Sequence, residues 1–540
     1  MSGFYVVSSA EGDSLRHKSI LSGMLITDRS IIIDQGGWDS FEASSALSKN
    51  DLLEIRDGRF FVVKSFGGEL VARVDSFGAD AIFLYRNRGE WAFSNSFYEL
   101  IKYCKSLGWP LVIDHGVLAS MFVSGSIGRQ LLSSQTPVAQ INLVPPEKYI
   151  SCNLNESIVS EKDLPVSVTK NIDYEESLTE WFIKWRSVLF SLAINSNDKI
   201  SVDLSGGVDS RMLFGLVASS SAKERFEFFS QPHKPKDLAV AKSLCEKFDC
   251  TLNFSPPNWK ALPIEFQYDA YCRGNMGFYN LPVTPPLHYS CSNIFKVNGV
   301  GGENLRSFYN GSGADWLKKI KKGLPRHLEV YEEDVSDLLY RSYGEFGIDP
   351  DDPNGMMVHY RKLRSRIIGG RNSFEKLKFN MVTPLTDPVL VDINDFSSRE
   401  NGLEMYRDIM LAGGGRQLIV HPYDEEGKRF DDDFVDKSSF LNFSGSSLWK
   451  DPEIEYSVYA SDLGASLSSP PESFEFDGLR NLADKIDKES RLARDSLDFS
   501  CVPPAFFELY ESDEWSGSEG RKGAIETITW HAVLKLLNLG

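Results

Sequence analysis

The segment KISVDLSGGVDSRMLFGLVAS, residues 199–219, sets two adjacent glycines and an acid between two apolar runs. The alternating apolar residues at 200–204 predict a short buried strand, and the apolar run at 212–217 predicts a helix. A strand that turns through glycines directly into a helix brings backbone N–H groups and the positive end of the helix dipole to one point. The chemistry expected at this turn is therefore the binding of a phosphate.

The residue types within the turn narrow the kind of phosphate site. Gly206 and Gly207 lack the Cβ atoms that would keep an incoming group off the backbone, and Ser210 is expected to be the N-cap of the helix. A Walker-type loop needs a lysine followed by serine or threonine, and a dinucleotide fingerprint needs a third glycine in register; this segment has neither. Asp209 would repel a phosphate unless a divalent cation neutralised it, so its presence implies Mg²⁺.

The turn resembles the SGGxDS pyrophosphate-binding loop of the ATP pyrophosphatases. The resemblance implies that ATP binds with its β- and γ-phosphates in the loop while its α-phosphate is attacked. The residues of the loop that are expected to contact ATP are Leu204, Ser205, Gly206, Gly207, Asp209 and Ser210. An ordinary glycine turn between a strand and a helix stays open as the alternative.

The order of elements along the chain makes the resemblance more specific. Residues 1–150 hold short alternating segments separated by turn residues, as in antiparallel sheets: FYVVSS, SIIID, RFFVVKSF, LVARVDS, AIFLYRN and EWAFSN. We expect a polar linker over 151–175. Over 176–540 we expect a helix at 178–192, strand–loop–helix units and then mostly helical patterns. The predicted fold class is therefore α/β, with an α+β N-terminal domain.

This order resembles the asparagine synthetase family. The segments MSGFYVV, ARVDSFGADAIFLYRNRGEWAFSN and GRQLLSSQTPVAQINLVPPEKYI are similar to parts of its glutaminase-like domain, which has the Ntn-hydrolase fold. The resemblance implies a β-sandwich between helices over residues 1–150. It implies an ATP pyrophosphatase domain over 176–540, with a parallel sheet and a helical C-terminal part.

The N-terminus departs from the family. Glutaminases of this family use an N-terminal cysteine, whereas position 2 here is Ser2, and a hydroxyl is a far poorer nucleophile than a thiol near neutral pH. The glutamine-shaping segment of the family has no recognisable counterpart. We expect the domain to be catalytically silent, as in β-lactam synthetases and lasso-peptide cyclases, with Ser2 as an alternative nucleophile left open.

A second glycine-rich loop lies in IFKVNGVGGENLRSFYNG, residues 294–311. It resembles the family segment whose backbone approaches adenosine and whose acid helps to bind Mg²⁺, which points to Gly299 as an ATP contact and Glu303 as a metal ligand. Val300 replaces the glutamate of asparagine synthetases and the tyrosine of β-lactam synthetases. A glycine bend capped by a solvated glutamate is the alternative. Upstream, Ser230 is expected near the adenine. Asp237 is as consistent with a plain N-cap as with a functional acid.

Later segments hold weaker candidates. YRDIMLAGGGRQLIVHPYDEEGKRF resembles the family segment with a lysine that stabilises charge on the acyl-adenylate, which makes Lys428 the catalytic candidate and Arg416 the runner-up. A solvated surface lysine is the alternative for Lys428. The acidic run YDEEGKRFDDDF is expected to be a solvated loop.

The composition limits the function classes. The net charge of −18 argues against a nucleic-acid-binding protein, which would usually be basic. The sequence contains no run of about 18 apolar residues, so no membrane span is predicted. The N-terminus lacks the basic and apolar regions of a signal peptide, so a cytoplasmic location is expected. The seven scattered cysteines are typical of reduced core thiols.

These observations predict an asparagine synthetase-like ligase with ATP and Mg²⁺ as cofactors. A small-molecule or peptide carboxylate would be adenylated, with Asp209 and Glu303 holding the metal, and ammonia or an amine would displace AMP. Two alternatives remain: an intramolecular cyclase of the β-lactam synthetase or lasso-cyclase type, and a non-catalytic scaffold that keeps the fold. Self-association into a homodimer also stays open.

Overall fold

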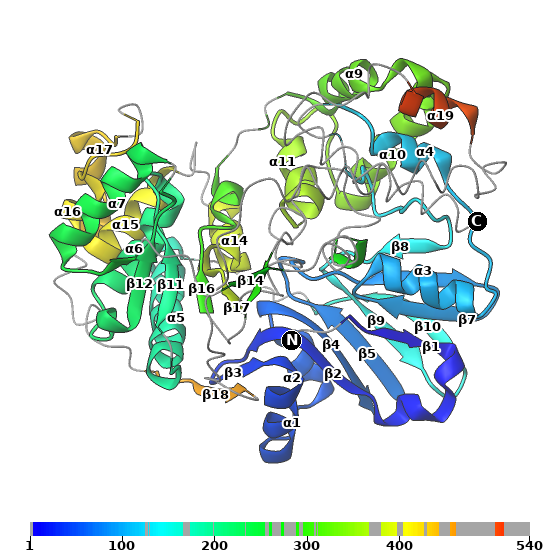
Figure 1. Ribbon diagram of the computed structural model, residues 1–540, viewed down its shortest axis with the longest axis horizontal. Coiled ribbons are helices and arrows are strands. Elements are labelled where there is room, and N and C mark those ends of the chain that lie inside the picture. The colour runs from blue at the N-terminus through cyan, green and yellow to red at the C-terminus, as the bar shows by residue number, and fades with distance from the viewer. Residues whose placement is uncertain are drawn as a thin grey trace.

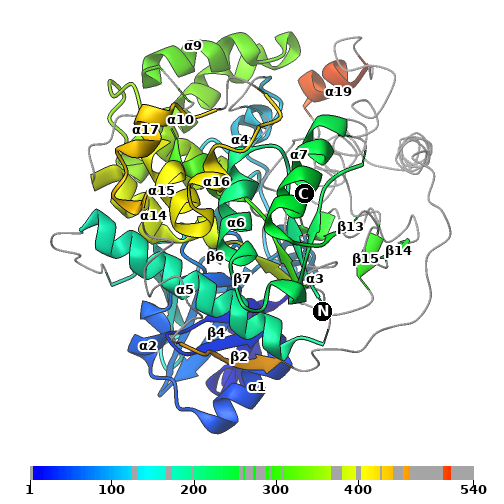
Figure 2. The ribbon, with the colours of Figure 1, turned by 90° about the vertical axis from the view of Figure 1, so that its left-hand side faces the viewer.

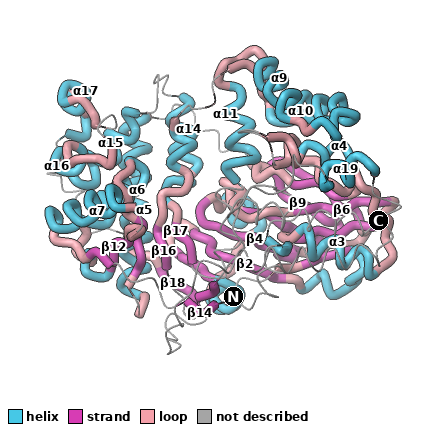
Figure 3. The backbone as a smooth tube through the Cα atoms, turned by 45° about the horizontal axis from the view of Figure 1, so that its top comes forward, coloured by secondary structure: helices cyan, strands magenta, loops and turns pink. Residues whose placement is uncertain are grey.

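The structure is a computed structural model with a mixed α/β fold. It describes residues 4–124, 128, 130–165, 173–197, 199–232, 234–253, 259–261, 272–274, 288–290, 295–306, 309, 311–366, 380–396, 403–425, 429–441, 454–460 and 503–511. Two groups of strands lie side by side, the antiparallel strands of the N-terminal part and a parallel sheet (Figure 1). Figure 3 shows these strands as a band with helices along the top and at the left.

The N-terminal unit contains two sheets. The first has the order β1-β7-β6-β8, formed by Val6–Ser8, Glu90–Ser94, Phe83–Asn87 and Ile141–Leu143. The second has the order β10-β9-β5-β4-β2-β3-β18, formed by Ile158–Asp163, Lys148–Asn153, Glu69–Val74, Asp57–Phe66, Ser19–Ile26, Ser30–Ile33 and Ser457–Ala460. The six strand segments predicted within residues 1–150 are confirmed as β1, β3, β4, β5, β6 and β7, whereas β2 and β9 were not among the predicted strands.

The two sheets face each other between layers of helices. On β4, Phe61 and Val63 pack into the core between the sheets, while Phe60 and Val62 pack against α1 (Asp34–Ser44) and α2 (Lys49–Glu54). This period of two divides the strand between two cores. On the outer face of the first sheet, α3 (Phe97–Ser106) and α4 (His115–Ser120) supply the next layer. The expected β-sandwich between helices is therefore what the structure contains.

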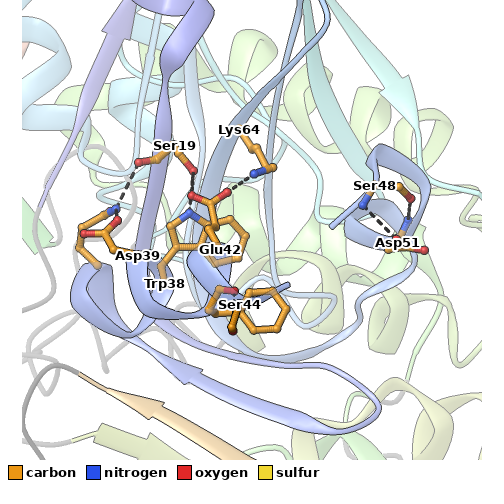
Figure 4. A network of polar contacts seen from close by, with 10 residues as sticks. Ser19, Trp38, Asp39, Glu42, Ser44, Ser48, Asp51 and Lys64 are labelled. Carbon is orange, nitrogen blue, oxygen red and sulfur yellow. Dashed lines mark hydrogen bonds and ion pairs between the residues drawn. The ribbon is translucent and has the colours of Figure 1, made fainter. Parts of the chain in front are cut away.

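A polar network holds α1 to the second sheet (Figure 4). Trp38 Nε1 donates to Ser19 Oγ at 2.7 Å, and Ser19 Oγ donates to Glu42 at 2.6 Å. Lys64 of β4 forms an ion pair with the same glutamate. At the end of the helix, Ser44 donates to the hydroxyl of Tyr459 on β18 at 3.4 Å. The network therefore ties α1 to β2 and β4 and to the distant strand β18.

The second unit contains a parallel sheet of order β13-β12-β11-β16-β17. Its strands are Leu252–Asn253, Phe226–Phe229, Ile200–Asp203, Phe295–Val297 and Asn380–Val382. The helices that pack with it around one apolar core, several of them at the front of Figure 2, are α5 (Tyr174–Asn195), α6 (Val208–Ala218), α7 (Pro235–Phe248), α14 (Pro388–Phe396) and α15 (Leu403–Gly414). The predicted helix at 178–192 and the strand–loop–helix unit around the glycine turn are confirmed.

The strand order places a topological switch point between β11 and β16. From β11 the chain moves through β12 to β13 on one side, and then crosses to β16 and β17 on the other. In open parallel sheets a ligand crevice forms outside the carboxyl ends of the strands at this point. The loops that follow β11 and β16 are the two glycine-rich loops singled out in the sequence.

The remaining elements are mostly helical. The helices α9 (Gly313–Gly323), α10 (Glu332–Phe346), α11 (Gly355–His359) and α19 (Pro504–Glu511) lie with α4 over the first sheet (Figure 1). The π-helix η5 (Tyr360–Ser365) continues α11. The short elements are α16 (Arg416–Ile419), α17 (Asp432–Asp436), β14 (Trp259–Ala261), β15 (His288–Ser290), η1 (Ser9–His17), η2 (Lys223–Arg225), η3 (Gly302–Leu305), η4 (Arg326–Tyr331) and η6 (Pro384–Thr386).

Two expectations about organisation need correction. The segment expected to be a linker over 151–175 begins with strand structure, because β9 pairs with β5 and β10 pairs with β9. In addition, the expected helical end of the chain contributes β18, which pairs in parallel with β3. No helix in the described part of the chain is long and apolar enough to cross a membrane. The cysteines that the structure describes are free thiols.

Candidate functional site

A cavity of about 470 Å³ lies at the carboxyl ends of the parallel strands. Its walls include the residues after β11, β12 and β16 and the start of η5. The lining residues are Asp203, Leu204, Ser205, Asp209, Ser210, Phe229, Ser230, Gln231, Lys234, Asp237, Gly299, Val300, Glu303 and Tyr360. The two glycine-rich loops and Ser230, which lie far apart in the sequence, therefore share one cavity.

The loop after β11 is tied together by its own side chains. Ser205 N donates to Ser210 Oγ at 3.0 Å, and Gly207 N donates to Ser205 Oγ at 3.2 Å. Gly206 N donates to the carboxylate of Asp237 at 3.0 Å. These bonds partly correct the expected phosphate site. The backbone N–H groups of Ser205, Gly206 and Gly207 already have partners within the protein. The N–H groups left for an anion belong to the first turn of α6, where a helix supplies no intrahelical partner.

Two cap assignments are also corrected. The N-cap of α6 is Gly207, and Ser210 lies in the first turn, where its hydroxyl braces the loop. The N-cap of α7 is Lys234, and Asp237 lies in the first turn of the helix. Asp237 reaches the glycine loop and is a site residue whose contact the sequence reading did not foresee. Only its place just after a strand and before an apolar helix could have suggested it.

The two loop glycines differ in what lies beside them. A Cβ on Gly206 would stand 2.4 Å from Cβ of Asp424. The space beside Gly206 is therefore filled by a side chain of the protein and is not open to a ligand. A Cβ on Gly207 would meet only Ser205 Oγ, at 3.4 Å. The open space beside the loop is therefore at Gly207.

The second glycine loop packs directly on Asp209. A Cβ on Gly299 would lie 3.1 Å from Cβ of Asp209, and one on Gly302 would lie 2.7 Å from its carboxylate. Gly301 has a φ of 99° and sits against the carbonyl oxygen of Leu385, where a side chain would be strained. The glycines thus allow the loop to bring Glu303 beside Asp209.

Glu303 is half-buried and held by hydrogen bonds. One of its carboxylate oxygens accepts a hydrogen bond from Gly301 N at 3.2 Å, and Tyr360 OH donates to the other at 3.5 Å. Burial raises the pKa of Glu303, and the neighbouring charge of Asp209 raises it further. These contacts favour a held carboxylate over the solvated glutamate of the alternative. The tyrosine starts a π-helix, an irregularity that occurs frequently at functional sites.

Ser230 has the geometry of a ligand contact. It follows β12, its side chain is 2% exposed, and its hydroxyl has no hydrogen-bond partner among the residues that the structure describes. A buried hydroxyl without a partner is costly. Because Ser230 lines the cavity, a bound ligand would supply the missing partner.

Arg211 anchors the loop to the segment behind it. Its buried guanidinium donates to the carbonyl oxygens of Leu418, His421 and Pro422 at 3.3, 2.7 and 2.7 Å. It also lies 3.6 Å from the ring centroid of Tyr423. The segment carrying Asp424 is therefore fixed against Gly206, although sequence reasoning did not assign Arg211 a role.

The remaining candidates lie elsewhere. Lys428 and Ser2 fall outside the residues that the structure describes. Arg416, the runner-up, forms ion pairs with Asp432 and Asp436 at the exposed start of α16, and it does not line the cavity. Part of the expected acidic loop is helix α17.

The pair of carboxylates fits a magnesium ion. Within the described residues no group of three or more His, Cys, Asp or Glu side chains is placed to hold a metal. Mg²⁺, however, usually takes one or two carboxylates and completes its shell with water and substrate phosphates. Two adjacent carboxylates that are partly shielded from water repel each other unless a cation lies between them. Asp209 and Glu303 meet that description.

Comparison with known proteins adds little. No protein-family model matches the chain, and no curated protein matches it. Among solved structures, the glutamine phosphoribosylpyrophosphate (PRPP) amidotransferase from B. subtilis complexed with ADP and GMP is similar at 7% identity with a TM-score of 0.16. That alignment covers 60% of this chain and 61% of the other. A TM-score this low carries no argument about fold or function.

Proposed function

We propose that the protein is an ATP-dependent ligase that forms an amide bond through an acyl-adenylate, releasing AMP and pyrophosphate. The observation that carries the proposal is the meeting of Asp209 and Glu303 across two glycine loops, at the switch point of a parallel sheet. The fold and the cavity are compatible with the asparagine synthetase-like resemblance of the sequence. The loop at 205–210 has the acid and lacks the lysine of a Walker-type site.

In this proposal the N-terminal turn of α6 and the hydroxyls of Ser205 and Ser210 bind the pyrophosphate part of ATP. The backbone at Gly299 and the hydroxyl of Ser230 contact the nucleoside side. Asp209 and Glu303 would hold Mg²⁺, which when bound neutralises charge on the phosphates. A substrate carboxylate attacks the α-phosphorus, the bond to the β-phosphate oxygen breaks, and an amine then displaces AMP from the acyl carbon. Lys428 remains the candidate for stabilising the acyl-adenylate.

Exchange of labelled pyrophosphate into ATP tests the first half-reaction. We expect exchange that depends on Mg²⁺ and on a carboxylate taken from a panel of amino acids and peptides. Analysis of the nucleotide products should show AMP and pyrophosphate. ADP and phosphate as the products, or full exchange in an Asp209→Asn variant, would contradict the proposal.

The nitrogen donor is proposed to be ammonia or a substrate amine, because a serine hydroxyl such as that of Ser2 is a weak nucleophile unless a base is well placed beside it. We expect no glutamate release from glutamine, with or without ATP. We also expect Ser2→Ala to leave the ligase step unchanged. Glutamate production that disappears in Ser2→Ala would restore a working amidotransferase.

A further inference from the structure

A second cavity, of about 570 Å³, lies between the two units. It is separate from the cavity at the ends of the parallel strands, which is proposed to bind ATP and is called the nucleotide cavity below. Leu53, Arg73 and Phe77 of the N-terminal unit line one side, and Asn304 and Val391 of the second unit line the other. Its size is that of small-molecule sites, and apolar side chains form much of its wall.

The guanidinium of Arg73 is buried in the wall and only partly satisfied. Its Nη1 donates to the carbonyl oxygens of Leu52 and Leu53 at 2.9 and 2.6 Å, and its Nε donates to Val74 O at 3.3 Å. The first two bonds cap the C-terminus of α2, which gives this arginine a structural role. Nη2, however, has no hydrogen-bond partner within the described residues, and the side chain is 0% exposed.

The charge of Arg73 also lacks a dedicated counterion. Burial lowers the pKa of its guanidinium to about 10, and the nearby charge of Asp75 offsets part of that shift. The carboxylate of Asp75 is itself engaged by Ala79 N and Asp80 N at 3.0 and 3.1 Å. Because a buried cation is costly without an anion beside it, the chemistry of this wall calls for a ligand with a negative charge.

Four of the other charged side chains that line the cavity form two ion pairs. Arg56 lies 3.9 Å from a carboxylate oxygen of Asp392, and Lys362 forms an ion pair with Glu147. Each of these pairs spans the two units. Arg361 also lines the cavity, but its guanidinium donates to Asn304 O, and Asp163 is exposed. Arg73 is therefore the buried cation with an N–H group left for an anion.

On the opposite wall, Asn304 supplies a hydrogen-bond acceptor. Its side chain is 3% exposed, and Oδ1 has no partner among the residues described. The backbone carbonyl of the same residue is used by Arg361, whose Nη2 donates to it at 2.8 Å. A lone amide oxygen in a buried wall requires an N–H or O–H donor.

We propose that this cavity binds a small amino acid-like molecule, with its carboxylate on Arg73 and an N–H group on Asn304. The guanidinium matches a carboxylate in charge and geometry, and the amide oxygen matches an ammonium or amide N–H. Leu53, Phe77 and Val391 provide apolar walls for the rest of the molecule. Glu303 lines the first cavity and Asn304 lines this one, so two consecutive residues of η3 face the two cavities.

The first test is thermal unfolding of the full chain with a panel of the common L-amino acids. We expect at least one to raise Tm, since a ligand that binds only the folded state stabilises it. Titration calorimetry then compares that amino acid with its carboxamide and with the analogue that lacks the amino group. Each analogue should bind at least about tenfold more weakly, because each loses one hydrogen bond in a buried wall.

Two substitutions separate binding from folding. Arg73→Met removes the anion site but also the cap of α2. Val391→Trp fills the cavity from α14 and leaves that cap intact. Both should abolish amino acid binding, while Val330→Trp, at a side chain that is 74% exposed, should not. Asp209→Asn should also leave binding unchanged, which distinguishes this cavity from a substrate site beside the nucleotide.

The proposal is overturned if no amino acid binds, or if binding survives Val391→Trp in a folded protein. Loss of binding in Asp209→Asn would assign the amino acid to the nucleotide cavity instead. Equal binding of inorganic phosphate would mean that Arg73 selects charge alone, which contradicts the pairing with Asn304.

Discussion

Asp209 is the residue on which the proposed chemistry depends most, because it lies between the loop that would hold the phosphates and the loop that carries Glu303. Asp209→Asn keeps the shape and removes one negative charge. We expect a fall in pyrophosphate exchange of at least about a hundredfold, with the Tm retained. Exchange kinetics and thermal unfolding of the same preparation measure the two effects.

A matched control is Asp249→Asn, at a surface aspartate whose side chain is 98% exposed. It makes the same chemical change outside the cavity and should leave the exchange rate unaltered. Equal losses in both variants would mean that the protein responds to its overall charge, and Asp209 would then have no specific role.

Glu303 should act through the metal requirement. Glu303→Gln keeps an acceptor for Gly301 N but no longer offers a charged oxygen to a cation. We expect half-maximal activity to need a higher Mg²⁺ concentration, with a smaller increase for Glu303→Asp. The measurement is the exchange rate across a Mg²⁺ titration. A Glu303→Gln curve that overlays the wild-type curve would exclude this carboxylate as a ligand.

At the scale of elements, the two glycines of the β11–α6 turn should behave differently. In Gly206→Ala the new methyl group would stand 2.4 Å from Cβ of Asp424, so a packed segment must move. We expect a loss of about 1–3 kcal/mol in the free energy of unfolding. Gly207→Ala has room for its methyl group and a φ of −83°, so its stability should be unchanged.

The same pair separates folding from nucleotide binding. Gly207→Ala places its methyl group on the open side of the turn, where ATP is proposed to lie, and should weaken nucleotide binding. Calorimetric titration with ATP and chemical denaturation of both variants provide the comparison. A stable Gly207→Ala variant with wild-type ATP affinity would exclude this turn as the binding site of the ATP phosphates.

Elements whose pattern is local were predictable. An alternating apolar run, a glycine pair and an apolar run identify β11, the turn and α6, because burial and backbone freedom are encoded at those residues themselves. The same holds for β4, whose residues alternate between two apolar cores. The sequence therefore indicated where the cavity lies, because the loops that follow β11 and β16 could be identified and both line it.

Contacts between distant segments were not predictable. The outermost strand, β10, carries exposed and half-buried residues in no apolar alternation, and β18 consists of four residues that become a strand only beside β3. Asp237 was left open between a plain N-cap and a functional acid, because nothing near it in the sequence indicates Gly206 N as its partner. Such pairings arise from tertiary packing, which one sequence does not display.

On the scale of the whole molecule, the two units are joined by buried polar contacts as well as by β18. Arg59 of β4 donates to Thr383 Oγ1, at the end of β17, at 2.8 Å. Lys184 of α5 lies 3.0 Å from Asp57 of β4 and also forms an ion pair with Asp387. Trp185 Nε1 donates to the same carboxylate of Asp387 at 2.9 Å. One lysine therefore stands between two acids from different units.

This arrangement predicts how stability depends on pH. Burial, and then the charge of Asp387, raise the pKa of Asp57 to about 6, despite the opposing effect of Lys184. Because the folded protein holds this proton more tightly than the unfolded chain does, protonation of Asp57 stabilises the fold below about pH 4. That contribution is lost as the pH rises through about 6. Asp57→Asn should remove this dependence without lowering stability at pH 7.

Removing the shared cation should have the opposite effect. Lys184→Met leaves Asp57 and Asp387 facing each other without a counterion, which we expect to cost about 3 kcal/mol at pH 7, with much of the loss recovered near pH 5 as Asp57 takes up a proton. Calorimetric unfolding of wild type, Asp57→Asn and Lys184→Met at pH 5 and pH 7 compares the three. If Asp57→Asn lost as much stability as Lys184→Met at pH 7, the carboxylate of Asp57 would be a net source of attraction between the units, and its raised pKa would be wrong.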